Sequence, residues 1–476
     1  MINSNYAGIY GLRLNPSLTP TSRLYMDFNL IGMQGFIDND YAYISNKDFF
    51  GILFNGDEPV YYTLENEKRS FTINRSSQYK HGFQNLAMTG PSGMVVMGKN
   101  AFGITTTART LSSFRNLPPD IANFLYEAID FDVQHGINYV HDRDIYISSL
   151  SWIELGINYA YILKRHKWDY LSAGITLKPL FGTSGFYTSI SHVDYIVHND
   201  TTATVNDATF GYAFSLPINY LTNAYEPGPL FKGYGLGLDV GITYMYTRKG
   251  ETAYYFDRLC EQEYESYNFK IGFSLLDIGF IKFSKKTVNK TFDHVSTVWY
   301  KPYDTLSNSS LNNLVKKVDS YFDTPGVGQT VSKDYFTMNL PPTASLQADY
   351  WLKDNYYLNL IIYYPLPVFN HNYFYKPSII AITLRYETAR FEISLPLSWY
   401  DWRIDKPRLG FSVRYGNFFI GADHLNTYFG LSDFTGADFY AGIRMNLSNM
   451  FKLNFIKGLC GMKRVNNIET FDYRNF

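Results

Sequence analysis

The chain is poor in cysteine, in charge and in long apolar runs, and each shortage excludes a class of protein. Its two cysteines, Cys260 and Cys460, stand far apart and form neither a metal-binding spacing nor a disulfide framework. Charged residues make up 18% of the 476 residues, whereas typical soluble domains carry about 25%. The formal net charge is -1, so the chain offers nucleic acid no basic surface.

The sequence also lacks a segment that would make a transmembrane helix. Its most apolar stretch, residues 356–369, is interrupted by Asn359, Pro365 and Pro367, and a spanning helix needs about 20 apolar residues without such breaks. If the chain crosses a membrane, it must do so as a closed β-barrel, the other structure that satisfies every backbone group in lipid. The first residues show no signal peptide. An outer-membrane protein needs one, so we expect a mature or trimmed chain.

Aromatic residues are abundant, with 43 Tyr and 37 Phe, and Tyr suits a surface that meets both lipid and water. Residues 233–250 alternate between an apolar face and a small or polar face, on which Met245 is the one large apolar member. The apolar face carries Tyr234, Leu236, Leu238, Val240, Ile242, Tyr244 and Tyr246. Lipid outside and a polar lumen inside select this pattern. It recurs within residues 153–163, 171–178, 391–399 and 437–447.

The lengths of the strands and of their connections separate a barrel from a soluble β-sandwich, which also alternates. The alternating segments run for roughly 8–15 residues, and sandwich strands average about 5–6. Short connections stand at 353–355, 388–389 and 416–417, and long polar ones at 45–90, 117–148, 249–266 and 301–339. Short turns at one end and long loops at the other are typical of outer-membrane barrels.

We therefore predict an all-β, antiparallel transmembrane outer-membrane β-barrel of about 14–16 strands over residues 24–447, with long extracellular loops. Sixteen candidate strands can be counted, and fourteen fits nearly as well. The candidates begin near residues 24, 92, 101, 149, 169, 203, 233, 266, 288, 343, 356, 378, 390, 407, 418 and 436. An even count places both termini on the periplasmic side. Residues 448–476 are then a C-terminal periplasmic tail.

Two segments do not fit the wall. Residues 1–23 contain Asn15-Pro16 and do not alternate, which predicts an N-terminal hatch or plug folded into the lumen. Inward glycines of residues 233–241 are expected where this hatch packs closely. Residues 118–131 begin with two prolines and then place apolar residues at helical spacing. We expect a short loop helix there, and packing against neighbouring loops is favoured over capping the barrel mouth.

The sequence shows no catalytic motif. Residues 90–93 and 182–185 come near a lipase nucleophile elbow, but neither reads GxSxG. Asp423 and His424 are neighbours on a strand, so their side chains point to opposite faces. Histidines six residues apart match no standard zinc site. We predict no enzyme activity, no cofactor and no metal.

The inward positions of the strands carry charges of both signs. Facing charges of opposite sign pair into networks, and a lumen of this kind holds a plug better than it passes bulk water, because an ion-selective pore favours one sign. Simple stabilisation of the barrel interior is the default interpretation. The lumen-facing candidates are Glu154, Lys178, Asp239, Asp349, Arg385, Glu387, Glu392, Arg414, Asp438 and Arg444.

Several segments resemble known barrel families. The N-terminal LRLNPSLTPTSRLYMDFNLIG, with Asn15 and Pro16, resembles the hatch region of FadL-like fatty-acid transporters and of the PorV-type barrels of Bacteroidota type 9 secretion. The phrases NLAMTGPSGMVVMGKNAFGITTTAR, SWIELGINYAYIL, FEISLPLSWYDW and GADFYAGIRMNL resemble an uncharacterised family of Bacteroidota outer-membrane barrels. This resemblance spans residues 5–447. Its motifs are structural, so no ligand contact carries over.

Two functions follow as hypotheses for a bacterial outer-membrane protein. FadL-like relatives imply a side opening and a plugged conduit for a hydrophobic or small solute, with a hydrophobic small molecule as ligand. PorV-like relatives imply a docking platform for protein secretion or surface-protein assembly, with a secretion-system protein as partner. Outer-membrane lipid surrounds the barrel in both. The sequence slightly favours the conduit.

Overall fold

The computed structural model describes residues 2–445, apart from residues 25, 57, 65–66, 130, 167, 255–262, 302–309, 324–327 and 369–373. The predicted tail, residues 448–476, lies outside the described residues.

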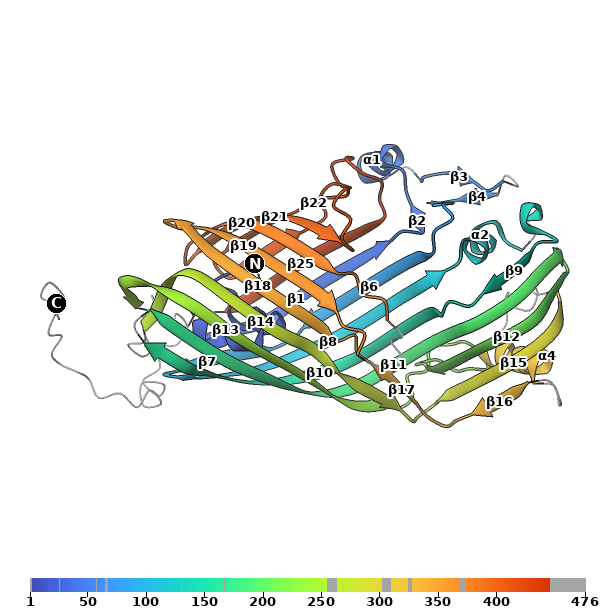
Figure 1. Ribbon diagram of the computed structural model, residues 1–476, viewed down its shortest axis with the longest axis horizontal. Helices are drawn as coiled ribbons and strands as arrows, with labels where there is room; N and C mark the ends of the chain where they lie inside the picture. The colour runs from blue at the N-terminus through green and yellow to red at the C-terminus, as the bar shows by residue number, and fades with distance from the viewer. Residues whose placement is uncertain are drawn as a thin grey trace, which may run out of the picture.

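The main body is one antiparallel sheet that closes on itself into a barrel of fourteen strands (Figure 1). Closure joins the first strand to the last, with pairs running from Phe28 and Met445 to Asp38 and Gly436. The wall consists of β1 (Met26–Asn39), β6 (Lys80–Thr89) with β7 (Ser92–Met97), β8 (Asn100–Leu117), β10 (Ile145–His166), β11 (Asp169–Asn199), β13 (Gly233–Tyr254), β14 (Glu263–Phe283), β18 (Thr343–Lys353), β19 (Tyr356–Pro365), β20 (Ile379–Glu387), β21 (Phe391–Tyr400), β22 (Arg408–Leu409) with β23 (Phe411–Tyr415), β24 (Phe418–Ala422) and β25 (Gly436–Met445). The predicted all-β barrel is confirmed.

On one side the wall continues well beyond the rest of the barrel, at the right of Figure 1. The first part of β11 pairs with β13, and the part from Gly185 onward pairs with β12 (Thr202–Ser215). Next to β12 lies β15 (Val288–Tyr300), which pairs in turn with β16 (Gln329–Ser332). The short β17 (Phe336–Asn339) returns to the edge of β14. This extension belongs to the same sheet as the wall and continues beyond the neighbouring strands.

The extension explains why a count of sixteen strands is wrong. The candidates near residues 203 and 233 are β12 and β13, which share the neighbour β11 and occupy one position in the wall. Between them, residues 216–232 contain Pro217, Pro227 and Pro229, and proline cannot donate to a sheet ladder. The candidates near 266 and 288 likewise form one position, β14 continued by β15. Sixteen candidates therefore give fourteen strands.

The two ends of the barrel differ in their connections. Tight turns such as Gly416-Asn417 and Asp354-Asn355 close the end at which β1 begins and β25 ends. The longest connections lie at the other end and contain α1 (Asn46–Asn55), α2 (Pro119–Glu127), η3 (Asp132–Gln134), α4 (Leu311–Phe322) and the short strands β2 (Ala42–Tyr43), β3 (Tyr61–Tyr62), β4 (Lys68–Arg69), β5 (Thr72–Ile73) and β9 (Asn138–His141). One expectation is wrong: residues 249–266 do not form a connection at this end. Because β13 and β14 remain paired as far as Tyr254 and Glu263, this segment belongs to the short-turn end.

The predicted alternation decides which side chains face out. On β13, Leu236 is 55% exposed and Ile242 43% exposed, whereas Asp239 and Thr243 are buried in the lumen. Along the described chain, no helix has the length and apolar character that crossing a membrane requires.

The chain start lies inside the barrel. It forms two short 3-10 helices, η1 (Gly8–Arg13) and η2 (Pro16–Thr21). From within the barrel, η1 contacts β1 and β7, and η2 contacts β10, β11 and β13. Asn15 begins η2, because its side-chain oxygen accepts a hydrogen bond from the Ser17 amide at 2.9 Å. An extended Asn before a Pro is a common way to start a helical turn.

Candidate functional site: the barrel lumen

The turn at Asn15 and Pro16 is attached to the wall by side-chain hydrogen bonds. The Asn15 amide nitrogen donates to the Gln347 Oε1 atom at 3.0 Å. The Ser17 hydroxyl lies 2.7 Å from the Thr243 hydroxyl. All four side chains are buried, so each bond is protected from competition with water.

Glycines on the facing strands make this close approach possible. A Cβ atom on Gly241 would lie 2.0 Å from the Asn15 Oδ1 atom, and one on Gly174 would lie 2.4 Å from the Pro16 carbonyl oxygen. No side chain fits at either distance. The glycines at these wall positions therefore leave the space that the chain start occupies.

The segment is also attached by charges near the short-turn end. The Asn5 backbone amide donates to the Glu387 carboxylate at 3.2 Å, and the Asn5 side chain donates to the same group. Arg385 pairs with Asp349 at 2.7 Å and with Glu387 at 2.8 Å. Arg23 stands 3.8 Å from Glu387. These pairs join two wall strands to both ends of the inserted segment.

A second group of charges contacts the middle of the segment. The Arg444 guanidinium donates to the carbonyl oxygens of Tyr6 and Ala7 at 2.7 and 2.9 Å. The Asp27 carboxylate accepts from the Ile9 amide at 2.9 Å. The backbone of the segment therefore meets a cation at its carbonyls and an anion at an amide, which is the favourable arrangement for both.

Further along the lumen, five charged side chains from five strands form a network on one wall. Arg109 pairs with Asp277 through two contacts of 2.8 and 3.1 Å, and with Glu154 at 3.5 Å. Lys178 contacts Asp239 at 2.6 Å and Asp277 at 3.1 Å. All five are buried. Buried charges are retained only when they are paired in this way.

The ten lumen candidates predicted from the sequence are all buried, but the structure brings them together in separate groups. Glu154, Lys178 and Asp239 share the five-strand network, and Asp349 and Arg385 form the group near the chain start. Glu392 pairs with Arg414 at 3.2 Å. Asp438 joins no ion pair of the described residues; its carboxylate accepts from the Asp423 amide at 2.6 Å.

Sequence reasoning missed Arg109 and Asp277. Asp277 has a φ of 56° and lies at a bulge in β14. In the sequence, the one sign of this bulge is that the apolar alternation shifts by one position, from Phe273 and Leu275 to Leu276 and Ile278. Arg109 lies at an inward position of β8, but its neighbours are mostly threonines and serines, so the alternation of apolar and polar residues is weak there. Lys376 was also missed, because it enters the lumen from a loop. Burial lowers the pKa of Lys376 to about 8, and the nearby Asp277 partly opposes that effect.

An apolar layer lies above the five-strand network, toward the long-loop end. On β8, β10 and β11 the next inward residues in that direction are Leu111, Trp152 and Leu180, all nearly inaccessible to solvent. Phe283 and Met338 continue the layer. Phe374, from the connection between β19 and β20, packs into it. The lumen is thus filled in levels: the chain start, then charges, then apolar side chains.

A cavity of about 340 Å³ remains between these levels. Arg13 and Lys376 reach it from the chain start and from the loop, and the charged network borders one side. The apolar side chains around it include Leu12, Phe36, Phe83, Leu276, Ile361 and Phe419. A cavity of this size and character accommodates a small, largely apolar molecule.

These features define a closed fourteen-strand antiparallel barrel whose lumen contains its own N-terminal segment and a cavity. The chain belongs to the family described as "Family of unknown function (DUF5723)", whose model matches residues 16–423. No curated protein matches the chain.

Among solved structures, the chain is similar to the P. putida toluene transporter TodX, at 10% identity and a TM-score of 0.40, with 92% of this chain and 94% of that chain covered. The Ralstonia pickettii toluene transporter TbuX shows 9% identity and a TM-score of 0.38, with 92% and 93% covered. A Pseudomonas aeruginosa FadL homologue shows 12% identity and a TM-score of 0.38, with 90% and 91% covered. Values of this size assign no substrate.

Proposed function

We propose that this protein is a plugged conduit for a small hydrophobic solute in the bacterial outer membrane. The observation that carries the proposal is the cavity of about 340 Å³ that lies in the lumen between the N-terminal segment and the wall strands. The segment, residues 1–23, acts as the hatch, and the lumen-facing charges hold it in place. The outward apolar side chains, such as Leu236 and Ile242, are in contact with lipid.

The hatch is held by many weak attachments. Each neutral hydrogen bond contributes only about 1 kcal/mol, so the bonds at Asn15 and Ser17 can be exchanged for others when the hatch moves. Two of the ion pairs lie within the wall itself, since Arg385 retains Asp349 and Arg109 retains Asp277. When the hatch is displaced, the five charged side chains of the network therefore remain paired with one another.

A side route through the wall is the second element of the proposal. Between β6 and β7 the strand is interrupted at Gly90-Pro91, and the Asn29 side chain donates to the Gly90 carbonyl at 2.9 Å in place of a ladder bond. Likewise, the Thr106 amide donates to the Ser92 hydroxyl at 3.1 Å. The neighbouring residues Gly32 and Thr105 line the cavity. A solute would leave the lumen toward the lipid at this interruption.

The decisive experiment locks the hatch to the wall. With Cys260→Ser and Cys460→Ser as background, Ser17→Cys with Thr243→Cys replaces two hydroxyls 2.7 Å apart by a pair that can form a disulfide. Proteoliposomes are then tested for entry of a hydrophobic dye such as N-phenylnaphthylamine. We expect the oxidised protein to pass little dye and the reduced protein to recover passage.

The matched control is Thr110→Cys with Ser151→Cys, whose hydroxyls lie 3.0 Å apart on neighbouring wall strands and do not involve the hatch. This disulfide should leave dye passage unchanged. If the hatch-locked protein passes equal amounts of dye when oxidised and when reduced, solute passage does not depend on hatch movement. The proposal of a conduit opened by its hatch would then be wrong. Docking of a secretion-system protein stays a prediction.

A further inference from the structure

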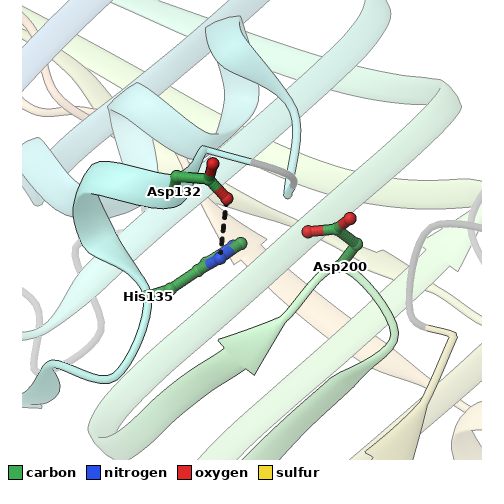
Figure 2. A group of neighbouring side chains, drawn as sticks. All are labelled: Asp132, His135 and Asp200. Carbon is green, nitrogen blue, oxygen red and sulfur yellow. Dashed lines mark ion pairs between the residues drawn. The ribbon is translucent and has the colours of Figure 1, made fainter.

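Three metal-ligand side chains meet at the long-loop end of the molecule (Figure 2). Asp132 begins η3, His135 follows that helix directly, and Asp200 lies in the turn between β11 and β12. One ligand atom from each residue lies within 4.8 Å of the other two. Two loops that are distant in the sequence thus supply one group of donors.

The ring of His135 is oriented by a backbone contact. Its Nε2 atom lies 2.8 Å from the carbonyl oxygen of Ile129, and because a carbonyl can only accept, Nε2 carries the hydrogen. Its Nδ1 atom faces the Asp132 carboxylate at 3.3 Å. Metal-binding histidines commonly donate their second ring N–H to a backbone carbonyl in this way. The side chain is only 13% exposed, so the ring is held in position.

The charge around His135 calls for a cation. A neutral ring with hydrogen on Nε2 turns the Nδ1 lone pair toward Asp132, and the Asp200 carboxylate points into the same space (Figure 2). Among the described residues, neither carboxylate pairs with a lysine or an arginine. Two carboxylates and a lone pair at this separation repel one another, and a cation between them would replace that repulsion by attraction. A metal ion bound by the three side chains would supply that charge.

We propose that Asp132, His135 and Asp200 bind a divalent cation of borderline softness, with Zn²⁺ as the best match. Imidazole together with carboxylates suits Zn²⁺, whereas Ca²⁺ and Mg²⁺ favour sites made of oxygen alone. Three protein ligands leave one tetrahedral position for water. The bound ion would join the connection after α2 to the β11–β12 turn, beside the existing hydrogen bond of 2.8 Å from the Gly136 amide to the Val197 carbonyl.

The test is calorimetric titration of the purified full chain in detergent with Zn²⁺, after removal of metals by a chelator. We expect one Zn²⁺ site whose affinity falls about tenfold or more in Asp200→Asn and in His135→Gln, since even the loss of an outer partner costs about 10–100-fold. Co²⁺ should give visible absorption bands typical of tetrahedral coordination in the native chain and not in these variants. An excess of Ca²⁺ should not displace the Zn²⁺.

Two variants control for ordinary surface histidines and His–Asp pairs. His198 forms a hydrogen bond with Thr204, so His198→Gln tests an imidazole that lies near Asp200 in the sequence but outside the proposed site. The His192 ring contacts Asp142 at 2.6 Å, so Asp142→Asn tests a paired carboxylate. Both should titrate like the native chain. If Asp200→Asn binds Zn²⁺ as tightly as the native chain, or if Ca²⁺ displaces the ion, the proposed site is wrong. Neither result bears on the conduit, which is tested in the lumen.

Discussion

Arg109 on β8 and Asp277 on β14 form a bidentate ion pair, with contacts of 2.8 and 3.1 Å, although three wall strands lie between them. Lys178, from one of the strands between, binds the same carboxylate at 3.1 Å. The pair therefore bridges the three intervening strands on one wall of the lumen and connects strands that are not neighbours. Because all three groups are buried, the loss of one member leaves charge without compensation.

The first prediction concerns Asp277. The substitution Asp277→Asn leaves Arg109 and Lys178 with one carboxylate fewer, and breaking a buried pair in this way costs about 3–5 kcal/mol. We expect the midpoint of urea unfolding of the lipid-inserted barrel, followed by its gel mobility, to fall clearly. The matched control is Asp169→Asn, which removes an exposed partner of Lys164 at 2.8 Å and should change the midpoint little. Equal behaviour of the two variants would contradict a structural role for the network.

The sequence predicts the wall well because a barrel strand obeys a local rule. The alternation around Asp239 and Thr243 assigns each side chain to lipid or lumen without reference to any other strand. The strand count fails in the same region, since β12 and β13 share one wall position, and only their common neighbour β11 reveals this. Residue spacing within one segment carries no information about such sharing.

The sequence predicts which residues face the lumen, but not which of them form ion pairs with one another. Inward positions such as Lys178 follow from alternation, but its partner Asp277 is distant in the chain and sits on a bulge with positive φ. The metal-ligand group could not be predicted for a related reason. Asp200 lies close to His135 only because β11 is long enough to place the β11–β12 turn beside η3. Contacts between segments depend on the register and length of strands, which a single sequence does not fix.

The second prediction uses the space at Gly241. A methyl group there would lie 2.0 Å from the Asn15 Oδ1 atom, so Gly241→Ala should displace the hatch without changing its sequence. We expect a higher conductance in planar lipid bilayers than that of the native protein, approaching the level of a chain lacking residues 2–22. Gly93→Ala is the control, because its new methyl would meet Phe28 at 3.4 Å, an ordinary contact. A silent Gly241→Ala that folds normally would argue against a hatch held by close packing.

The third prediction concerns the pH dependence of stability. Burial lowers the pKa of His424, in the loop after β24, to about 3, and Arg408 lowers it further. The unfolded chain binds this proton near pH 6.5, so the stability that neutral His424 contributes is complete above pH 6.5 and is lost as the pH falls toward 3. Between pH 7 and pH 5 this group alone should lower the free energy of unfolding by about 2 kcal/mol. His424→Gln should reduce that slope, whereas His198→Gln, at an exposed histidine, should keep it.

The fourth prediction tests the membrane position of the barrel with two substitutions on its outer surface. Leu236 on β13 is 55% exposed, and Val298 on β15 is 43% exposed, so both accept a longer side chain without steric conflict. Leu236 lies in the wall that we assign to lipid, where an arginine in a barrel costs about 2–4 kcal/mol at mid-membrane and less toward the interface. Val298 lies on the extension beyond the wall, where an arginine meets water. We therefore expect Leu236→Arg to impair insertion into lipid vesicles and to lower the unfolding midpoint, while Val298→Arg does neither. Equal effects would mean that lipid contacts both surfaces or neither, and the membrane boundary inferred from the alternation would be misplaced.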